Sequence, residues 1–275
     1  MNAIEHRLTK WLYRMFIDSP QAHAVLLRMY LGGEEFHQRF PWFDQTELVA
    51  DTELRLLMQQ HFADEQNHGK YFRLALTFKN EPITAPPLEM DALVQLAAGF
   101  WDAGILVGDV IEDLTGPTLF TNKQNLFVQL AFKDLSEKRA IHEFHIWRDL
   151  AKYKDPETYA ILKRVVEDED WHVQIFDHQV HKMMADPVDG PALRKVYTKL
   201  VKVAKRINRN SSTKFLSHVL DRDMLIAKPW EKRALRLLIG LLKIGTGVLP
   251  MESARRLIGL QAAVYDLPVV ATAHA

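Results

Sequence analysis

Apolar residues recur along most of the chain at intervals of three and four positions, which is the spacing of residues on one face of an α-helix. Alternation of apolar and polar residues, which is typical of β-strands, is scarce. Segments rich in proline and glycine, such as residues 80–91, interrupt the pattern and divide it into separate helices. The sequence therefore predicts an all-α protein.

The pattern predicts two pairs of long helices separated by a connecting helix. Ser19 and Asp51 are suitable N-cap residues for the first pair, and Pro20 suits the first position of a helix. A tight turn before Pro156 joins the second pair. The expected helices lie approximately over residues 1–18, 19–39, 51–79, 91–115, 123–153, 156–185, 191–209 and 228–262.

Two helical pairs joined by a long crossover are the connectivity of a ferritin-like four-helix bundle. We therefore expect such a bundle over residues 19–185, with an amphipathic N-terminal helix over residues 1–18. Residues 186–275 are expected to form a C-terminal helical extension packed on the bundle. In the crossover helix, Gly104 and Gly108 would allow a neighbouring helix to approach closely.

The composition narrows the classes of function. Lys plus Arg and Asp plus Glu both total 35, so the overall charge does not indicate a nucleic-acid partner. The absence of cysteine excludes disulfides, thiolate metal sites and a cysteine nucleophile, and it favours a cytoplasmic location. Charged residues interrupt the apolar residues at the N-terminus, so no secretory signal peptide is expected. No segment reaches the ~20 uninterrupted apolar residues of a transmembrane helix.

One motif, Asp-Glu-x-x-His-x-x-x-Phe, occurs twice, at residues 64–72 and 168–176. Residues three apart share a helix face, so Glu65 with His68, and Glu169 with His172, can each point together into the interior. A single Glu-x-x-His is not informative, because this shorter pattern also occurs by chance in "EEFH" at residues 34–37. Two copies that both begin with Asp are expected by chance only about once in a thousand such chains.

Paired carboxylates and imidazoles form an oxygen and nitrogen donor set. This set suits Fe(II) or Mn(II), whereas the absence of thiolates argues against a structural zinc site. A site for two metals also needs a glutamate from each of the two partner helices.

In the second pair, Glu143 and Glu169 are each thirteen residues from Pro156, so antiparallel helices would place them level with each other. Glu137 is the competitor, but it would lie about 9 Å lower by helical rise. The sequence therefore favours Glu143.

In the first pair, the candidates are Glu34 and Glu35. "EEFH" at residues 34–37 and "HEFH" at residues 142–145 align Glu35 with Glu143. The alignment favours Glu35, and Glu34 is the alternative ligand.

Asp64 and Asp168 each precede a motif glutamate. From that position an aspartate can reach the histidine of the neighbouring helix and accept the ring N–H that a metal leaves free. The alternative is that both are solvated surface residues.

These residues resemble those of the ferritin-like di-iron carboxylate superfamily, whose pattern is Glu, Glu-x-x-His, Glu, Glu-x-x-His. The resemblance covers about residues 20–185. The aspartate before each motif glutamate is similar to that of bacterial multicomponent monooxygenases, although these have Arg where this chain has Asn67 and Trp171. The six metal ligands that the resemblance implies are Glu35, Glu65, His68, Glu143, Glu169 and His172.

The resemblance implies two iron ions, or one manganese and one iron, with dioxygen as co-substrate. It implies an oxygenase or oxidase with no catalytic residues beyond the metal ligands, acting on a small, apolar or lipid-like organic molecule. Electrons would come from an external donor, because the chain has no cysteines for a rubredoxin-type site. The alternative is an iron-handling or peroxide-scavenging protein like ferritin or rubrerythrin.

Three features favour the oxygenase over storage: a chain much longer than a minimal bundle, the apolar crossover helix, and aromatic residues near the motifs. The basic, amphipathic segment 228–260 is expected to pack on the domain or form a homodimer contact, and peripheral membrane contact is the alternative. The aromatic residues concerned are Phe72, Phe144, Trp147 and Phe176.

Overall fold

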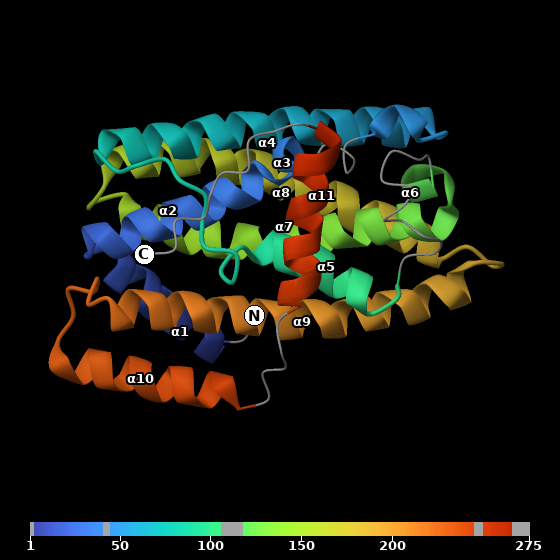
Figure 1. Cartoon of the computed structure of the whole chain (residues 1–275). Coiled ribbons are helices and arrows are strands. Elements are labelled where there is room, and N and C mark those ends of the chain that lie inside the picture. Colours follow the sequence, from blue (N-terminus) through green and yellow to red (C-terminus); the bar gives the residue numbers. More distant parts are fainter. Residues whose placement is uncertain (1–2, 41–44, 106–117, 245–249, 266–275) are drawn as a thin grey trace.

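The computed structural model describes residues 3–40, 45–105, 118–244 and 250–265. Within these ranges the chain forms helices and turns and has no β-strand (Figure 1). The all-α prediction is therefore confirmed for the part of the chain that the structure describes. No helix in that part is both long and apolar enough to cross a membrane.

The positions of the long helices agree closely with the sequence pattern. The helices are α1 (Ala3–Ile17), α2 (Pro20–Glu34), α3 (Phe36–Arg39), α4 (Thr52–Phe78), α5 (Ala92–Asp102), α6 (Thr118–Thr121), α7 (Lys123–Ala151), α8 (Pro156–Met184), α9 (Gly190–Asp221), α10 (Pro229–Lys243) and α11 (Met251–Tyr265), with a 3₁₀ turn, η2, at Thr46–Leu48. The two predicted helical pairs correspond to α2 with α4 and α7 with α8.

Three helix ends differ from the expectation, and the segment expected to be helical over residues 228–262 contains two helices, α10 and α11. The first core helix ends at Glu34 and not at Arg39, because the backbone leaves the helix at Glu35 before α3 begins. The crossover helix α5 ends at Asp102 and is followed by Gly104 in a left-handed conformation, with φ of 57°, which favours glycine. Gly108 lies outside the described residues. α9 continues to Asp221, well beyond the predicted end at residue 209.

Side chains at the helix starts explain why the long helices begin where they do. Asp51 accepts a hydrogen bond from Leu54 N at 3.1 Å, and Asp155 accepts one from Thr158 N at 3.2 Å. Ser19 occupies the N-cap position of α2, but its hydroxyl donates to the carbonyl of Met15 instead.

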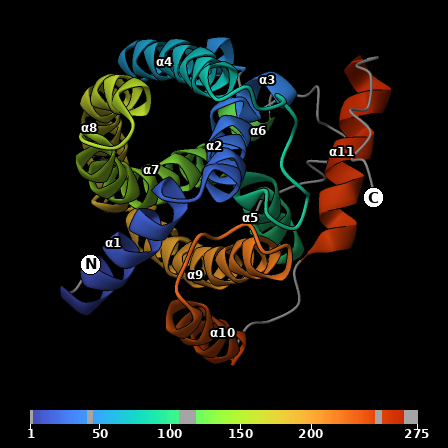
Figure 2. The same ribbon diagram turned by 90° about the vertical axis from the view of Figure 1, so that its left-hand side faces the viewer.

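The four helices α2, α4, α7 and α8 lie around a common interior, as the view along them in Figure 2 shows. α7 packs against α8, α8 against α4, and α4 against α2. α9 covers α7 and α5, while α10 and α11 lie outermost, against α9 and α5 respectively. The connecting segment thus contributes α5 to the side of the molecule and not to the common interior.

The apolar core is divided into two clusters. Along α4, Phe62 belongs to one cluster and Phe72 to the other. Along α8 the order is reversed, since Val165 belongs to the cluster of Phe72, and Phe176 to that of Phe62. The two helices are therefore antiparallel, and the repeated motif lies between the two apolar clusters.

A buried histidine links α2 to α7. Trp147 Nε1–H donates to His23 Nε2 at 3.1 Å, and His23 Nδ1 lies 3.5 Å from a carboxylate oxygen of Asp155. Burial and the nearby Lys79 ammonium lower the pKa of His23 to about 4, although the Asp155 carboxylate acts in the opposite direction. His23 is therefore neutral near neutral pH and carries its proton on Nδ1.

This burial predicts an acid-sensitive contribution to stability. The unfolded chain binds a proton at the ordinary histidine pKa of 6.5, whereas the folded chain excludes it down to about pH 4. The contribution of His23 is therefore complete above pH 6.5 and is lost as the pH falls toward 4. We expect a loss of about 3 kcal/mol in the free energy of unfolding across this window, measured by urea denaturation.

In His23→Gln this part of the pH dependence should be absent, whereas His178→Gln, at an exposed position, should retain it. Identical pH profiles for the parent and His23→Gln would contradict the assignment.

Candidate metal centre

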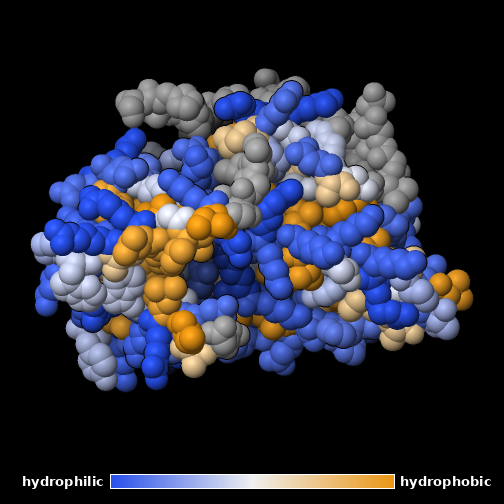
Figure 3. All heavy atoms as spheres, turned by 90° about the horizontal axis from the view of Figure 1, so that it is seen from below, coloured by the Kyte–Doolittle hydropathy of each residue, from blue (hydrophilic) through white to orange (hydrophobic). Residues whose placement is uncertain are grey.

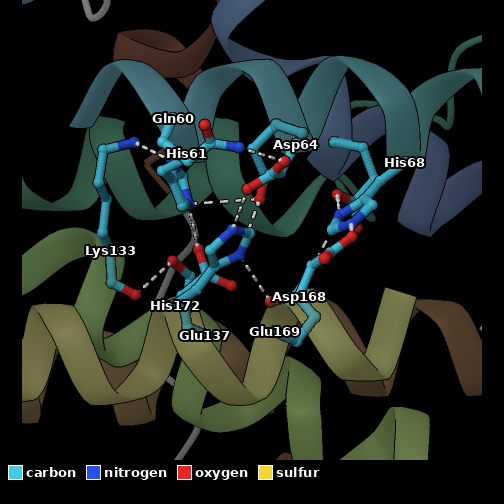
Figure 4. Close-up of polar contacts among 12 residues, drawn as sticks. Gln60, His61, Asp64, His68, Lys133, Glu137, Asp168, Glu169 and His172 are labelled. Atoms are coloured by element: carbon cyan, nitrogen blue, oxygen red, sulfur yellow. Dashed lines mark hydrogen bonds and ion pairs between the residues drawn. The ribbon is translucent and has the colours of Figure 1, made fainter. Parts of the chain in front are cut away.

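The antiparallel packing of α4 on α8 brings the two copies of the motif face to face (Figure 4). Glu65 and His68 lie on the inner face of α4, and Glu169 and His172 lie on the inner face of α8. All four residues are buried, and both histidines have no exposed surface. The structure therefore brings these four predicted residues together in the interior.

These residues belong to two groups of donors that could each hold a metal ion. In each group, one nitrogen or oxygen atom from every member lies within 4.8 Å of the others. Glu65 belongs to both groups. The His61 group comprises His61, Glu65, Glu137 and His172, and the Glu34 group comprises Glu34, Glu65, His68 and Glu169.

Glu65 is shared by the two groups, and Glu169 contacts a histidine of each. Glu65 Oε1 lies 3.3 Å from His61 Nε2 and 3.7 Å from His172 Nδ1, while Glu65 also belongs to the Glu34 group. Glu169 Oε1 lies 3.3 Å from His68 Nδ1, and its other oxygen lies 3.4 Å from His172 Nδ1. The two groups therefore adjoin each other across Glu65 and Glu169.

Each motif histidine also contacts an aspartate of the opposite helix. His68 Nε2 lies 3.1 Å from Asp168 Oδ2, and His172 Nε2 lies 3.4 Å from Asp64 Oδ2. Gln60 holds Asp64 by donating to its second oxygen at 2.9 Å. In a neutral ring whose Nε2–H donates to the aspartate, Nδ1 would be free to bind a metal in the interior. These are the cross-helix contacts that the repeat predicts.

Glu34, and not Glu35, is turned toward the site. Glu34 is buried, and its Oε2 lies 3.3 Å from His68 Nδ1. Glu35 instead accepts a hydrogen bond from Arg73, which is partly exposed on α4. Because α2 ends between the two glutamates, their side chains point to different sides. The alignment of residues 34–37 with residues 142–145 could not show that the helix ends between these two glutamates.

Gly69 helps to place this end of α2. A Cβ atom at position 69 would lie only 3.2 Å from Glu35 Cγ and 4.0 Å from Glu34 Cβ. The absence of a side chain at this position therefore allows α2 to approach α4 where Glu34 enters the site.

Glu137, and not Glu143, completes the His61 group, with its Oε1 3.0 Å from His61 Nε2. Counting both glutamates of the pair from Pro156 ignores the length of the turn, since α7 already ends at Ala151. Glu169 is thirteen residues from the start of α8, and Glu137 is fourteen residues from the end of α7, so these two are level. Glu143 is only eight residues from that end.

Glu143 belongs to a separate polar network. It accepts hydrogen bonds from the hydroxyls of Tyr13, at 2.7 Å, and Tyr30, and from Arg139 Nε at 3.3 Å. Burial acts to raise the pKa of Glu143, but the Arg139 guanidinium and the two hydroxyl donors outweigh it and lower the pKa overall. Glu143 is therefore an ionised carboxylate with its own donors, and it belongs to neither of the two groups that could hold a metal.

His61 is the residue that the sequence analysis missed. It lies one turn before Glu65 on α4, and this spacing of four residues is the signal that could have indicated it. The position corresponding to it in the second copy of the motif is Val165, so a comparison of the repeats does not reveal it. His61 adds a third imidazole to the donor set.

A buried lysine, Lys133, affects which ring nitrogen of His61 carries the proton. Lys133 Nζ lies 3.4 Å from His61 Nδ1 and 4.2 Å from the centre of the Phe62 ring. While the ammonium donates to Nδ1, a neutral His61 carries its proton on Nε2 and donates it to Glu137. His61 can act as a metal ligand only when that proton leaves Nε2.

The pKa shifts of the site residues show which positive charges a bound metal would replace. Burial, followed by repulsion from neighbouring carboxylates, raises the pKa of Glu65 and Glu137 well above the ordinary value. Burial acts to lower the pKa of His68, but hydrogen bonds to Glu169 and Glu34 outweigh it and raise the pKa overall. Protons and a histidine cation thus compensate the buried negative charge.

The donor set fits two divalent cations. Four buried carboxylates carry a charge that two such ions would balance, and carboxylate with imidazole suits Fe(II) or Mn(II). Glu65 Oε1, which lies in the interior, has no hydrogen-bond partner among the described residues. A buried carboxylate oxygen without a donor is costly, and a metal ion would satisfy it.

Comparisons of the chain with protein-family models, with curated proteins and with solved structures find no match. The functional inference therefore depends on the arrangement of these side chains.

Two pairs of glutamates test the ligand set, because each pair compares a residue inside the site with one outside. We expect Glu34→Gln and Glu137→Gln to bind iron at least about tenfold more weakly than the parent, since each removes a charged oxygen donor. Glu35→Gln and Glu143→Gln should bind as much iron as the parent. The measurement is iron per chain after loading and desalting.

Circular dichroism of each variant controls for misfolding. Loss of iron in folded Glu35→Gln or Glu143→Gln, with Glu34→Gln and Glu137→Gln unaffected, would reverse the choice of ligands.

Proposed function

We propose that this chain is a non-haem di-iron oxidoreductase, an oxygenase or oxidase that activates dioxygen. The observation that carries the proposal is the pair of adjoining donor groups, which share Glu65 and are joined by Glu169 through its contacts with His68 and His172. Two metals held by common carboxylates can act together on one small molecule. The pair of ions is iron with iron, or manganese with iron, because both pairs accept this donor set.

The helical arrangement supports a ferritin-like four-helix bundle built from α2, α4, α7 and α8. The four helices contribute Glu34, the Glu65 motif, Glu137 and the Glu169 motif in that order along the chain. This is the order Glu, Glu-x-x-His, Glu, Glu-x-x-His of the superfamily that the sequence resembles. A long segment that contains α5 connects the two pairs, as in bundles with a crossover.

Each part of the site has a distinct task in this proposal. Glu34, Glu137 and the two motifs would hold the metals, and Asp64 and Asp168 would orient the motif histidines. A bound, reduced metal pair supplies the electrons and the Lewis acidity for reaction with dioxygen. Lys133 and His61 hold a proton beside Glu137, where it can be exchanged when charge at the site changes.

Apolar side chains enclose the site and favour an apolar or lipid-like substrate. The Phe176 ring lies 4.8 Å from that of His61, between centres, and Phe62 lies in the same cluster. On the other side, Tyr30 packs 4.6 Å from Phe144 and 6.0 Å from Phe72. Such apolar walls limit the access of water, and the charged group among them, Lys133, is already engaged with His61. The electrons would come from an external donor.

Iron content and oxygen consumption together test the proposal. We expect about two iron ions per chain in the iron-loaded parent. Glu65→Ala and Glu169→Ala should hold far less, because each removes a carboxylate that joins the two groups. After chemical reduction, the parent should consume dioxygen much faster than either variant.

Size-exclusion chromatography separates the alternatives. A large shell that accumulates many iron ions per chain would support iron storage instead. A folded, iron-replete parent without bound iron would overturn the proposal.

A further inference from the structure

α10 lies at the outer edge of the molecule, on the side away from α4 (Figure 1). It packs against α9 through Leu235 and Ile239, which are both buried. Its face opposite α9 is open to solvent. This helix takes no part in the candidate metal centre.

The open face of α10 carries large apolar side chains. Trp230, Leu237, Leu241 and Ile244 recur at helical spacing, and between 58% and 73% of each is exposed. We call these four residues the outer stripe. Figure 3, which looks onto the face formed by α9 and α10, shows apolar surface in this region surrounded by hydrophilic residues. Exposed apolar groups gathered on one face indicate a binding surface.

The segment that comprises α9 and α10 is strongly basic, although the whole chain has no net charge. Residues 190–243 contain fourteen lysines and arginines and only three acidic residues. The basic residues are Arg194, Lys195, Lys199, Lys202, Lys205, Arg206, Arg209, Lys214, Arg222, Lys228, Lys232, Arg233, Arg236 and Lys243, and the acidic ones are Asp221, Asp223 and Glu231.

The charges are placed to face an external partner. Glu231, the acidic residue of α10, is buried and accepts a hydrogen bond from Arg14 at 3.0 Å. Arg233 and Arg236 are both exposed, one turn and one residue before Leu237 along α10. The outward face of α10 therefore presents apolar groups and positive charge together.

We propose that the outer stripe docks the protein onto the surface of an anionic lipid membrane. A helix that lies in a membrane interface inserts one apolar face and places Lys and Arg against lipid phosphates. Tryptophan suits the boundary, because its ring is apolar and its N–H is polar. The outer stripe and the surrounding charges have both properties.

The same features disfavour other partners. A symmetric dimer through this face would bring two basic surfaces together, which is unfavourable. A nucleic acid would contact the basic residues but would leave Leu237 and Leu241 exposed to water. Only an anionic apolar surface satisfies both features. This inference goes beyond the proposed function, since it involves no metal.

Vesicle sedimentation of the full chain tests the proposal. The vesicles contain about equal parts of phosphatidylcholine and phosphatidylglycerol, with vesicles of phosphatidylcholine alone as the comparison. We expect binding to the anionic vesicles only. Leu237→Ser with Leu241→Ser should weaken it at least about tenfold, because two inserted side chains are lost.

A control variant makes the same Leu→Ser changes at a different place on the surface. Leu56→Ser with Leu74→Ser alters two exposed leucines of α4 and should leave vesicle binding unchanged. Arg233→Gln with Arg236→Gln should weaken binding to anionic vesicles about fivefold or more for each lost charge. Iron content checks that the site of every variant is intact.

Several outcomes would overturn the proposal. Equal loss of binding in both leucine pairs would show that the outer stripe is not the docking surface, and no vesicle binding by the parent would remove membrane docking altogether. Loss of a dimer in Leu237→Ser with Leu241→Ser, with vesicle binding unchanged, would assign the face to a second copy. Because Glu65→Ala should still bind vesicles, failure here is distinguishable from failure of the di-iron proposal.

Discussion

Mutual repulsion among four buried carboxylates is the constraint on which the rest of this structure depends. Glu34, Glu65, Glu137 and Glu169 meet in an interior from which water is largely excluded, and unpaired charges there are very costly. The helices nevertheless converge on this point, with apolar clusters on both sides and aspartates that orient the two motif histidines. A pair of divalent cations would account for this arrangement, because it would balance the carboxylates and bind the inward-facing imidazole nitrogens.

Much of the fold and part of the site follow from local sequence rules. Helical periodicity and capping residues place α7 and α8 within two residues of their observed ends. The repeated motif identifies Glu65, His68, Glu169 and His172, because a spacing of three residues puts two side chains on one helix face whatever the neighbouring helices do.

The remaining site residues depend on information that a single helix does not contain. The choice between Glu34 and Glu35 depends on where α2 ends, and at that end α2 lies close to Gly69 of α4. The choice between Glu137 and Glu143 depends on the length of the turn between α7 and α8. His61 has no counterpart in the repeat, so only the assembled structure reveals it.

A crystal structure of the iron-loaded protein, with anomalous diffraction recorded at the iron edge, tests the central claim most directly. We expect two iron peaks between α4 and α8, one held by residues of the His61 group and the other by residues of the Glu34 group. A fully loaded crystal with no iron peak between α4 and α8, or with iron only at surface residues, would contradict it.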